Sequence, residues 1–193
     1  MTTYESEIRF LIPNIKVFEK RLKELNAEIV YEYEFSDHYF RPKTKEWNLL
    51  YKTIKIRECF KPEKKCEVLF NKAEIVNVEG FIFKRSVYPQ GKVKLFEGKF
   101  DLCETFLDDL EFENWFTIEK KNCKLMKIPK YDFKTVYEFV NNLGWTGELE
   151  IEGGNPEKVK EKLSEWIKIL KIEKNQITYK PLSLIHIEGR EFV

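Results

Sequence analysis

The sequence predicts an α+β protein that consists mainly of antiparallel β-sheet. Most of the chain alternates between apolar and polar residues with a period of two, which is the pattern of β-strands. Turn sequences such as "KPEKK", "YPQG", "IPKYD" and "NNLG" separate several of the alternating segments. So many consecutive strands indicate a meander, and such a sheet closes or packs as a sandwich to remove its exposed edges.

Three segments have the apolar spacing of helices. The first is expected from Ile15 to Ile29, with Asn14 as its cap. A second, shorter helix is expected from Asp101 to Leu110. In the third, Asn155 is the cap, and Pro156 at the first helical position precedes an apolar stripe of Val159, Leu163, Trp166, Ile167 and Leu170.

The other elements are expected to be strands, at residues 4–12, 30–41, 48–60, 65–75, 78–88, 92–99, 114–128, 133–142 and 146–153. No repeat, low-complexity segment or long linker interrupts them, so residues 1–186 are predicted to form one domain. Residues 187–193 include "IEGR", a protease-cleavage sequence that is often added for expression. Two interpretations of this tail are left open, an addition made for expression and a native end of the chain.

Composition restricts the class of protein. Charged residues make up 35% of the chain, but the net charge is only +1, which argues against a general nucleic-acid binder. The sequence has no apolar run of about 18 residues, so it predicts no membrane span. The first ten residues lack the apolar region of a signal peptide. The expected location is therefore cytoplasmic.

Four cysteines without a CxxC pair, and only two histidines, argue against a zinc site of the usual spacing. Free thiols in a reducing compartment are expected. Cys59 and Cys66 flank a predicted hairpin tip, so a disulfide between them is an alternative.

Charged residues share one face of several predicted strands. In "YESEIRF", Glu5, Glu7 and Arg9 point to one side of an extended chain, and the apolar residues point to the other. Near the other end of the chain, "GELEIEGG" places Glu148, Glu150 and Glu152 on one face. Each strand alone is explained by a solvated outer face.

The strands between these two carry bases on one face. They contribute Lys55 with Arg57, then Lys84, and then Lys120 with Asn122 and Lys124, while Glu138 interrupts an otherwise apolar face. If the sheet closes, acids and bases would line one interior. A divalent cation binds carboxylate oxygens, and Arg and Lys bind phosphate oxygens. A polyphosphate carried as its magnesium or manganese salt would satisfy both.

The sequence resembles the CYTH, or triphosphate tunnel metalloenzyme, superfamily over about residues 4–185. "ESEIR" resembles its ExExK motif, "SDHYF" its DxYF segment, "IKIR" its RxR strand and "LGWTGELEIE" its LGxxEIE strand, in the expected order. "FIFK", "FTIEKKN" and "ITYKPL" resemble three further segments. The resemblance implies a closed tunnel barrel of eight or more strands with flanking helices, formed by a CYTH-like domain over residues 1–186.

The resemblance also implies roles for single residues. It implies metal binding by Glu5, Glu7, Glu138, Glu150 and Glu152, and phosphate binding during catalysis by Arg9, Lys55, Arg57, Lys84 and Lys120. Glu97 falls near another acid of the family. Three positions depart from the family pattern: Arg9 replaces a Lys, Lys55 replaces an Arg, and Asn122 stands at a usual Arg position for which Lys124 is the expected substitute.

The implied activity is metal-dependent hydrolysis of inorganic triphosphate, a nucleoside triphosphate or thiamine triphosphate, with Mg²⁺ or Mn²⁺. The runner-up is a class IV adenylyl cyclase, which makes cyclic AMP and pyrophosphate from ATP. A non-catalytic polyphosphate-binding module, or a barrel whose charged faces are exterior, remain alternatives. The expected partner is a small-molecule triphosphate, with no nucleic acid or membrane, and a homodimer is left open. Trp47, Trp115 and Trp145 could stack an organic ring, but packing is the expected role of each.

Overall fold

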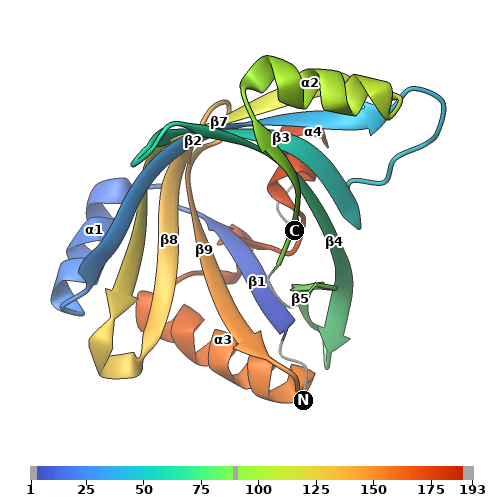
Figure 1. Ribbon diagram of the computed structural model, residues 1–193. Coiled ribbons are helices and arrows are strands. Elements are labelled where there is room, and N and C mark those ends of the chain that lie inside the picture. Colours follow the sequence, from blue (N-terminus) through green and yellow to red (C-terminus); the bar gives the residue numbers. More distant parts are fainter. Residues whose placement is uncertain (1–3, 89–90, 189–193) are drawn as a thin grey trace.

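The sheet curls into an uneven ring with helices around it (Figure 1). The computed structural model describes residues 4–88 and 91–188. In these two segments the strands are β1 Tyr4–Leu11, β2 Glu28–Pro42, β3 Lys52–Lys61, β4 Lys65–Val78, β5 Phe81–Ser86, β6 Val93–Gly98, β7 Phe112–Ile128, β8 Phe133–Val140, β9 Gly144–Gly153 and β10 Ile177–Thr178. The α-helices are α1 Ile15–Glu24, α2 Phe100–Asp109, α3 Pro156–Leu170 and α4 Leu182–Glu188.

The ring closes through strand β1. The order β1-β5-β4-β3-β2-β7-β8-β9 returns to β1, and every pairing is antiparallel. The β1–β9 seam runs from Tyr4↔Gly153 to Leu11↔Thr146, whereas the β1–β5 seam has only Ser6↔Arg85 and Glu7↔Lys84. Two further strands lie outside this closed path: β6 pairs with β4, and β10 pairs with β1. The predicted fold class, a closed antiparallel sheet with flanking helices, is confirmed.

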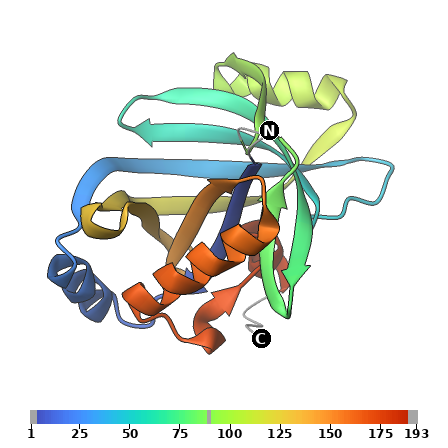
Figure 2. The same ribbon diagram turned by 90° about the horizontal axis from the view of Figure 1, so that it is seen from below.

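The main apolar core lies outside the ring, between the strands and the helices. Ile8 and Phe10 of β1 pack in one cluster with Phe18 of α1 and with Leu163 of α3, which covers this side of the sheet (Figure 2). A second cluster joins β3 and β4 to α2 through Cys103 and Leu107. Since side chains alternate along a strand, burying the apolar residues on the outer face turns the charged ones inward.

Helix α4 covers one end of the interior. Its Leu182 and Ile185 pack against Tyr39 of β2, Ile118 of β7 and Val140 of β8. The sequence did not predict α4 or β10, because neither has a pattern long enough to recognise without its neighbours. Of the expected tail, residues 187 and 188 belong to α4, and residues 189–193 lie outside the described residues.

The structure corrects some expected boundaries. Helix α1 ends at Glu24 rather than Ile29, because Asn26 adopts a left-handed conformation (φ 52°) and the chain turns into β2. Helix α3 begins at Pro156 with Asn155 as its cap, as predicted. No α-helix among the described residues is long and apolar enough to cross a bilayer.

The alternative of a disulfide between Cys59 and Cys66 is wrong. The hairpin between β3 and β4 forms as predicted, but its register pairs Cys59 with Lys65 and Glu58 with Cys66. Cys59 therefore faces the interior and Cys66 the outer apolar cluster. Both thiols are free.

Candidate active site

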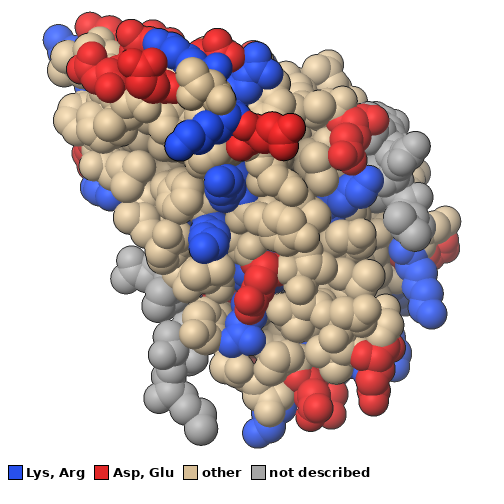
Figure 3. Space-filling model, turned by 90° about the vertical axis from the view of Figure 1, so that its right-hand side faces the viewer, with Lys and Arg blue, Asp and Glu red and all other residues tan. Residues whose placement is uncertain are grey.

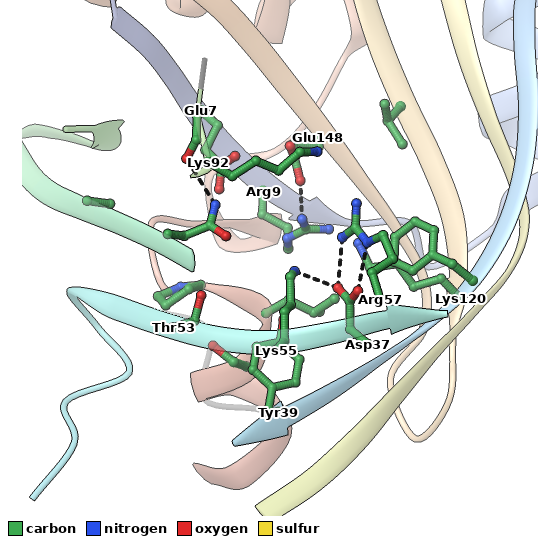
Figure 4. A pocket seen from close by; sticks show the side chains of 18 of the residues that line it. Glu7, Arg9, Asp37, Tyr39, Thr53, Lys55, Arg57, Lys92, Lys120 and Glu148 are labelled. Carbon is green, nitrogen blue, oxygen red and sulfur yellow. Dashed lines mark hydrogen bonds and ion pairs between the residues drawn. The ribbon is translucent and has the colours of Figure 1, made fainter. Parts of the chain in front are cut away.

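The interior of the ring is a charged cavity of about 480 Å³. Among the described residues, nine Lys or Arg and seven Asp or Glu line it, and labelled side chains from several strands converge on it in Figure 4. On the outer face seen in Figure 3, positive and negative side chains are interspersed over a largely uncharged surface. The alternative in which the charged faces are merely exterior is therefore wrong.

Three carboxylates form a group that could hold a metal ion. Glu5 and Glu7 of β1 and Glu150 of β9 each place an oxygen within 4.8 Å of the others. The Glu150 side chain is exposed to solvent, but desolvation by the protein around it, with the nearby Glu148 and Glu5 carboxylates, raises its pKa to about 8. Burial, followed by repulsion from Glu148, also raises the pKa of Glu5. Three clustered carboxylates, two of which have a raised pKa, fit a hard divalent cation such as Mg²⁺ or Mn²⁺.

Gly91 is fitted to this acid group. Its φ is +75°, and a Cβ atom there would clash with both carboxylate oxygens of Glu5. The Gly91 carbonyl accepts hydrogen bonds from Asn71 Nδ2 and Ser86 Oγ, both at 3.0 Å. Gly91 is thus anchored beside Glu5 just before β6 begins, and the next residue, Lys92, also lines the cavity. No sequence motif assigns a role to Gly91 or Lys92, although the turn signal "YPQG" ends at Gly91.

All five predicted phosphate-binding bases line the cavity. Arg9 donates to Glu138 at 2.8 Å and also contacts Glu148, and Lys120 donates to Glu138 at 2.6 Å. Lys84 forms an ion pair with Glu7 of the acid group. Each of these three bases therefore lies against a carboxylate of the cavity wall.

Asp37 holds the other two bases and was missed by the sequence analysis. Its carboxylate accepts hydrogen bonds from Lys55 Nζ at 2.6 Å, Arg57 Nε at 2.7 Å and Arg57 Nη2 at 2.8 Å (Figure 4). Burial alone would raise the pKa of Asp37, but Arg57 and Lys55 outweigh it and hold that pKa well below its usual range. Burial lowers the pKa of Lys55 to about 7, with Arg57 and Lys120 acting in the same direction and Asp37 against them. The segment "SDHYF" resembles the DxYF segment of the family, but the resemblance does not assign a role to its acid.

Two of the predicted metal ligands lie outside the acid group. Glu138 is buried (1% exposed) and contacts Arg9 and Lys120. Glu152 pairs in register with Glu5, but it is exposed and lines a separate surface pocket beside α3. Glu97 is exposed and contacts Lys94 at 2.6 Å, away from the cavity lining.

Lys124 does not substitute for an arginine at Asn122. A bulge in β7 shifts the register between Lys121 and Lys124, and Asn122 adopts a left-handed φ of 52°. Lys124 lies over the Tyr137 ring, outside the described cavity lining. The expectation was wrong because one extra residue in a strand reverses the faces of those that follow.

The three tryptophans pack as expected rather than lining the cavity. Trp47 contacts Phe70 and Phe112, Trp115 contacts Phe116, and Trp145 contacts Phe139. None of the three is among the residues described as lining the cavity.

Comparisons with solved structures show which fold this is. A conserved hypothetical protein from Pyrococcus furiosus superimposes with a TM-score of 0.70 at 26% identity, over 92% of this chain and 97% of that one. A proposed adenylate cyclase from Vibrio parahaemolyticus gives 0.71 at 14% identity, over 97% and 99%. A proposed adenylyl cyclase from Hippeastrum, described as having a dominant triphosphatase activity, gives 0.60 at 14% identity, over 97% of both chains.

No protein-family model and no curated protein sequence matches this chain. The structural likeness extends over almost the whole of each compared chain, so it concerns the complete ring of strands with its flanking helices. The protein therefore has the CYTH fold of the triphosphate tunnel proteins.

Proposed function

We propose that this protein hydrolyses a triphosphate with the help of a divalent cation, Mg²⁺ or Mn²⁺. The observation that carries the proposal is the group of Glu5, Glu7 and Glu150 beside five bases in one cavity. Carboxylates alone would suit a cation, and bases alone would suit an anion. The two sets side by side suit a metal-bound polyphosphate.

The acid group is the place for the cation. Glu5, Glu7 and Glu150 would hold it, and when bound it would neutralise phosphate charge and acidify a water molecule. Glu152 lies outside this group, and Glu138 positions Arg9 and Lys120 instead.

The bases hold and orient the phosphate oxygens. Lys84 contacts Glu7, so it is the base placed to bind a phosphate group next to the cation. Arg9, Lys55, Arg57 and Lys120 surround the remaining space and would stabilise the charge of the transition state. Helix α4 covers one end of the ring and would limit the access of bulk water there.

The test is ³¹P NMR of ATP and of inorganic triphosphate incubated with the protein and Mg²⁺ or Mn²⁺. Release of orthophosphate, abolished by Glu7→Gln and retained by Glu97→Gln outside the cavity, is the expected result. Pyrophosphate together with cyclic AMP would instead show the adenylyl cyclase. Binding without new products would indicate a polyphosphate-binding module, and unchanged spectra without line broadening would refute the proposal.

A further inference from the structure

Lys92 is a base of the cavity to which neither the sequence motifs nor the proposed function assigns a role. It lies just before β6 begins and is one of the charged side chains that converge on the cavity (Figure 4). Seven of the nine bases that line the cavity form ion pairs with carboxylates. The other two are Lys52, which lies over the Trp47 ring, and Lys92. Within the described part of the chain, the ammonium group of Lys92 therefore has neither a carboxylate nor a ring against it.

The backbone fixes the point from which the Lys92 side chain starts. The carbonyl of the preceding residue, Gly91, accepts hydrogen bonds from Asn71 and Ser86, both at 3.0 Å. Gly91 also lies so close to the Glu5 carboxylate that a Cβ atom would not fit between them. Lys92 therefore starts beside the acid group, whereas the five bases of the proposed function project from within strands of the ring.

Charged groups of both signs act on Lys92. Desolvation lowers the pKa of its ammonium group, and Arg57 acts in the same direction. The acids that oppose this change are Asp37, Glu5 and Glu150. In turn, desolvation raises the pKa of Glu5 and that of Glu150, and the positive charge of Lys92 opposes the rise in both. The ammonium group is thus close enough to the acid group on one side, and to Arg57 on the other, for its charge to affect both.

Packing of the fold does not account for this charge. The Lys92 side chain is exposed and belongs to none of the three buried apolar clusters found in the described residues. A lysine beside clustered carboxylates is expected to pair with one of them, as Lys84 does with Glu7. Lys92 forms no such pair, so its ammonium group can contact a ligand without first breaking an ion pair. In a cavity lined by bases, the ligand atoms that suit it are phosphate oxygens.

We propose that Lys92 is a further phosphate-binding residue, and that its free charge weakens cation binding at the acid group until a triphosphate is bound. This inference rests on the proposed function and deepens it. Without triphosphate, the ammonium group of Lys92 repels a divalent cation at the acid group. With triphosphate present, a phosphate oxygen neutralises that ammonium group and removes the repulsion. The cavity thereby favours the metal–triphosphate complex over the free cation.

The test is to remove the charge of Lys92 and to measure the two ligands separately. Electron paramagnetic resonance of free Mn²⁺ gives the Kd of the cation alone. Isothermal titration calorimetry at saturating Mn²⁺ gives the Kd of imidotriphosphate, an analogue of inorganic triphosphate that resists hydrolysis. Lys92→Met should bind Mn²⁺ about threefold more tightly than the wild type and imidotriphosphate about tenfold more weakly. A merely structural role for Lys92 would not move the two Kd values in opposite directions.

Two further variants serve as controls. Lys92→Arg keeps the charge and should bind both ligands like the wild type. Lys94→Met is the matched control, because Lys94 is also an exposed lysine, contacts Glu97 at 2.6 Å and is not among the residues described as lining the cavity. It should change neither Kd.

The inference is overturned if Lys92→Met binds imidotriphosphate as tightly as the wild type, if it binds Mn²⁺ no more tightly, or if Lys94→Met produces the same two changes. In each of these cases the wild type still binds imidotriphosphate with Mn²⁺, so the proposed function survives. If the wild type does not bind imidotriphosphate, both the inference and the proposed function fail. Circular dichroism of each variant excludes unfolding as the cause.

Discussion

Asp37→Asn is the substitution that most directly tests how the cavity holds its charges. Asp37 is completely buried (0% exposed) and accepts three hydrogen bonds from Lys55 and Arg57. Asparagine keeps one acceptor oxygen, but it removes the negative charge and directs an NH₂ group at donors. Two buried cations are then left without a counter-ion.

The loss of stability should be large. Removing one partner of a buried ion pair costs about 3–5 kcal/mol, because an uncompensated charge remains. For a chain of this size, each kcal/mol shifts the Tm by about 2–4 °C, so a fall of about 10 °C is expected.

The loss should also depend on pH. Burial already lowers the pKa of Lys55 to about 7, and without Asp37 it should fall further. Lys55 of the folded variant then releases its proton at a pH where Lys55 of the wild type is still charged. The loss of this charge relieves part of the repulsion between Lys55 and Arg57. The deficit relative to the wild type is therefore expected to be greater at about pH 5.5 than at about pH 8.

The assay is thermal unfolding followed by circular dichroism, with and without inorganic triphosphate. Triphosphate supplies the missing negative charge, so it should raise the Tm of Asp37→Asn more than that of the wild type. Glu113→Gln is the matched control, because Glu113 contacts Arg41 at 2.7 Å on the surface and should change stability by at most about 1 kcal/mol. A variant that melts at the wild-type temperature, or equal stabilisation of both proteins by triphosphate, would refute the reasoning.

The remaining predictions concern the acid group and two of the bases. Glu150→Gln removes one of the three clustered carboxylates, so the rise in Tm produced by Mn²⁺ should disappear, whereas Glu152→Gln should retain it; equal loss in both variants would contradict the assigned cation site. Triphosphate affinity of the wild type should fall as the pH rises through about 7, since Lys55 then loses its charge. Lys55→Arg should make Kd less dependent on pH over this range. If Kd changes with pH equally in the wild type and in Lys55→Arg, Lys55 is not the group responsible. Glu7→Gln frees Lys84 from its ion pair, so in EDTA this variant should bind inorganic triphosphate more tightly than the wild type does; calorimetry showing equal or weaker binding would exclude the effect.

The sequence predicted the strands and their faces well because period-two alternation is a local property. Ile8 and Phe10 point outward and Glu7 and Arg9 inward, as their spacing requires. The short helix α4 depends instead on burial against Tyr39, Ile118 and Val140, which lie far away in the sequence. The bulge in β7 adds a residue that only the register of neighbouring strands reveals, and it places Lys124 outside the cavity.

The site was predicted less completely than the fold, for a different reason. Motif and alternation placed the five bases in the cavity, because each is an inward residue of its own strand. They did not show which acid of the cavity pairs with which base. Asp37 lies opposite Arg57 and Glu138 contacts Lys120, and both relations depend on strands meeting in space. Likewise, Gly91 is required because its backbone lies against Glu5, which no local pattern reveals.

These pairings determine how ligands would enter the cavity. Glu7 is held by Lys84, and Asp37 holds Lys55 and Arg57, so a cation and an anion each meet groups that already have partners. A cation that takes Glu7 releases Lys84 for a phosphate group, and a phosphate that takes Lys84 releases Glu7 for the cation. Each ligand therefore removes a cost from the binding of the other, and this coupling must be equal in both directions. The same pairings make a strongly charged interior tolerable in the free protein, because an unpaired charge would otherwise be buried in the wall.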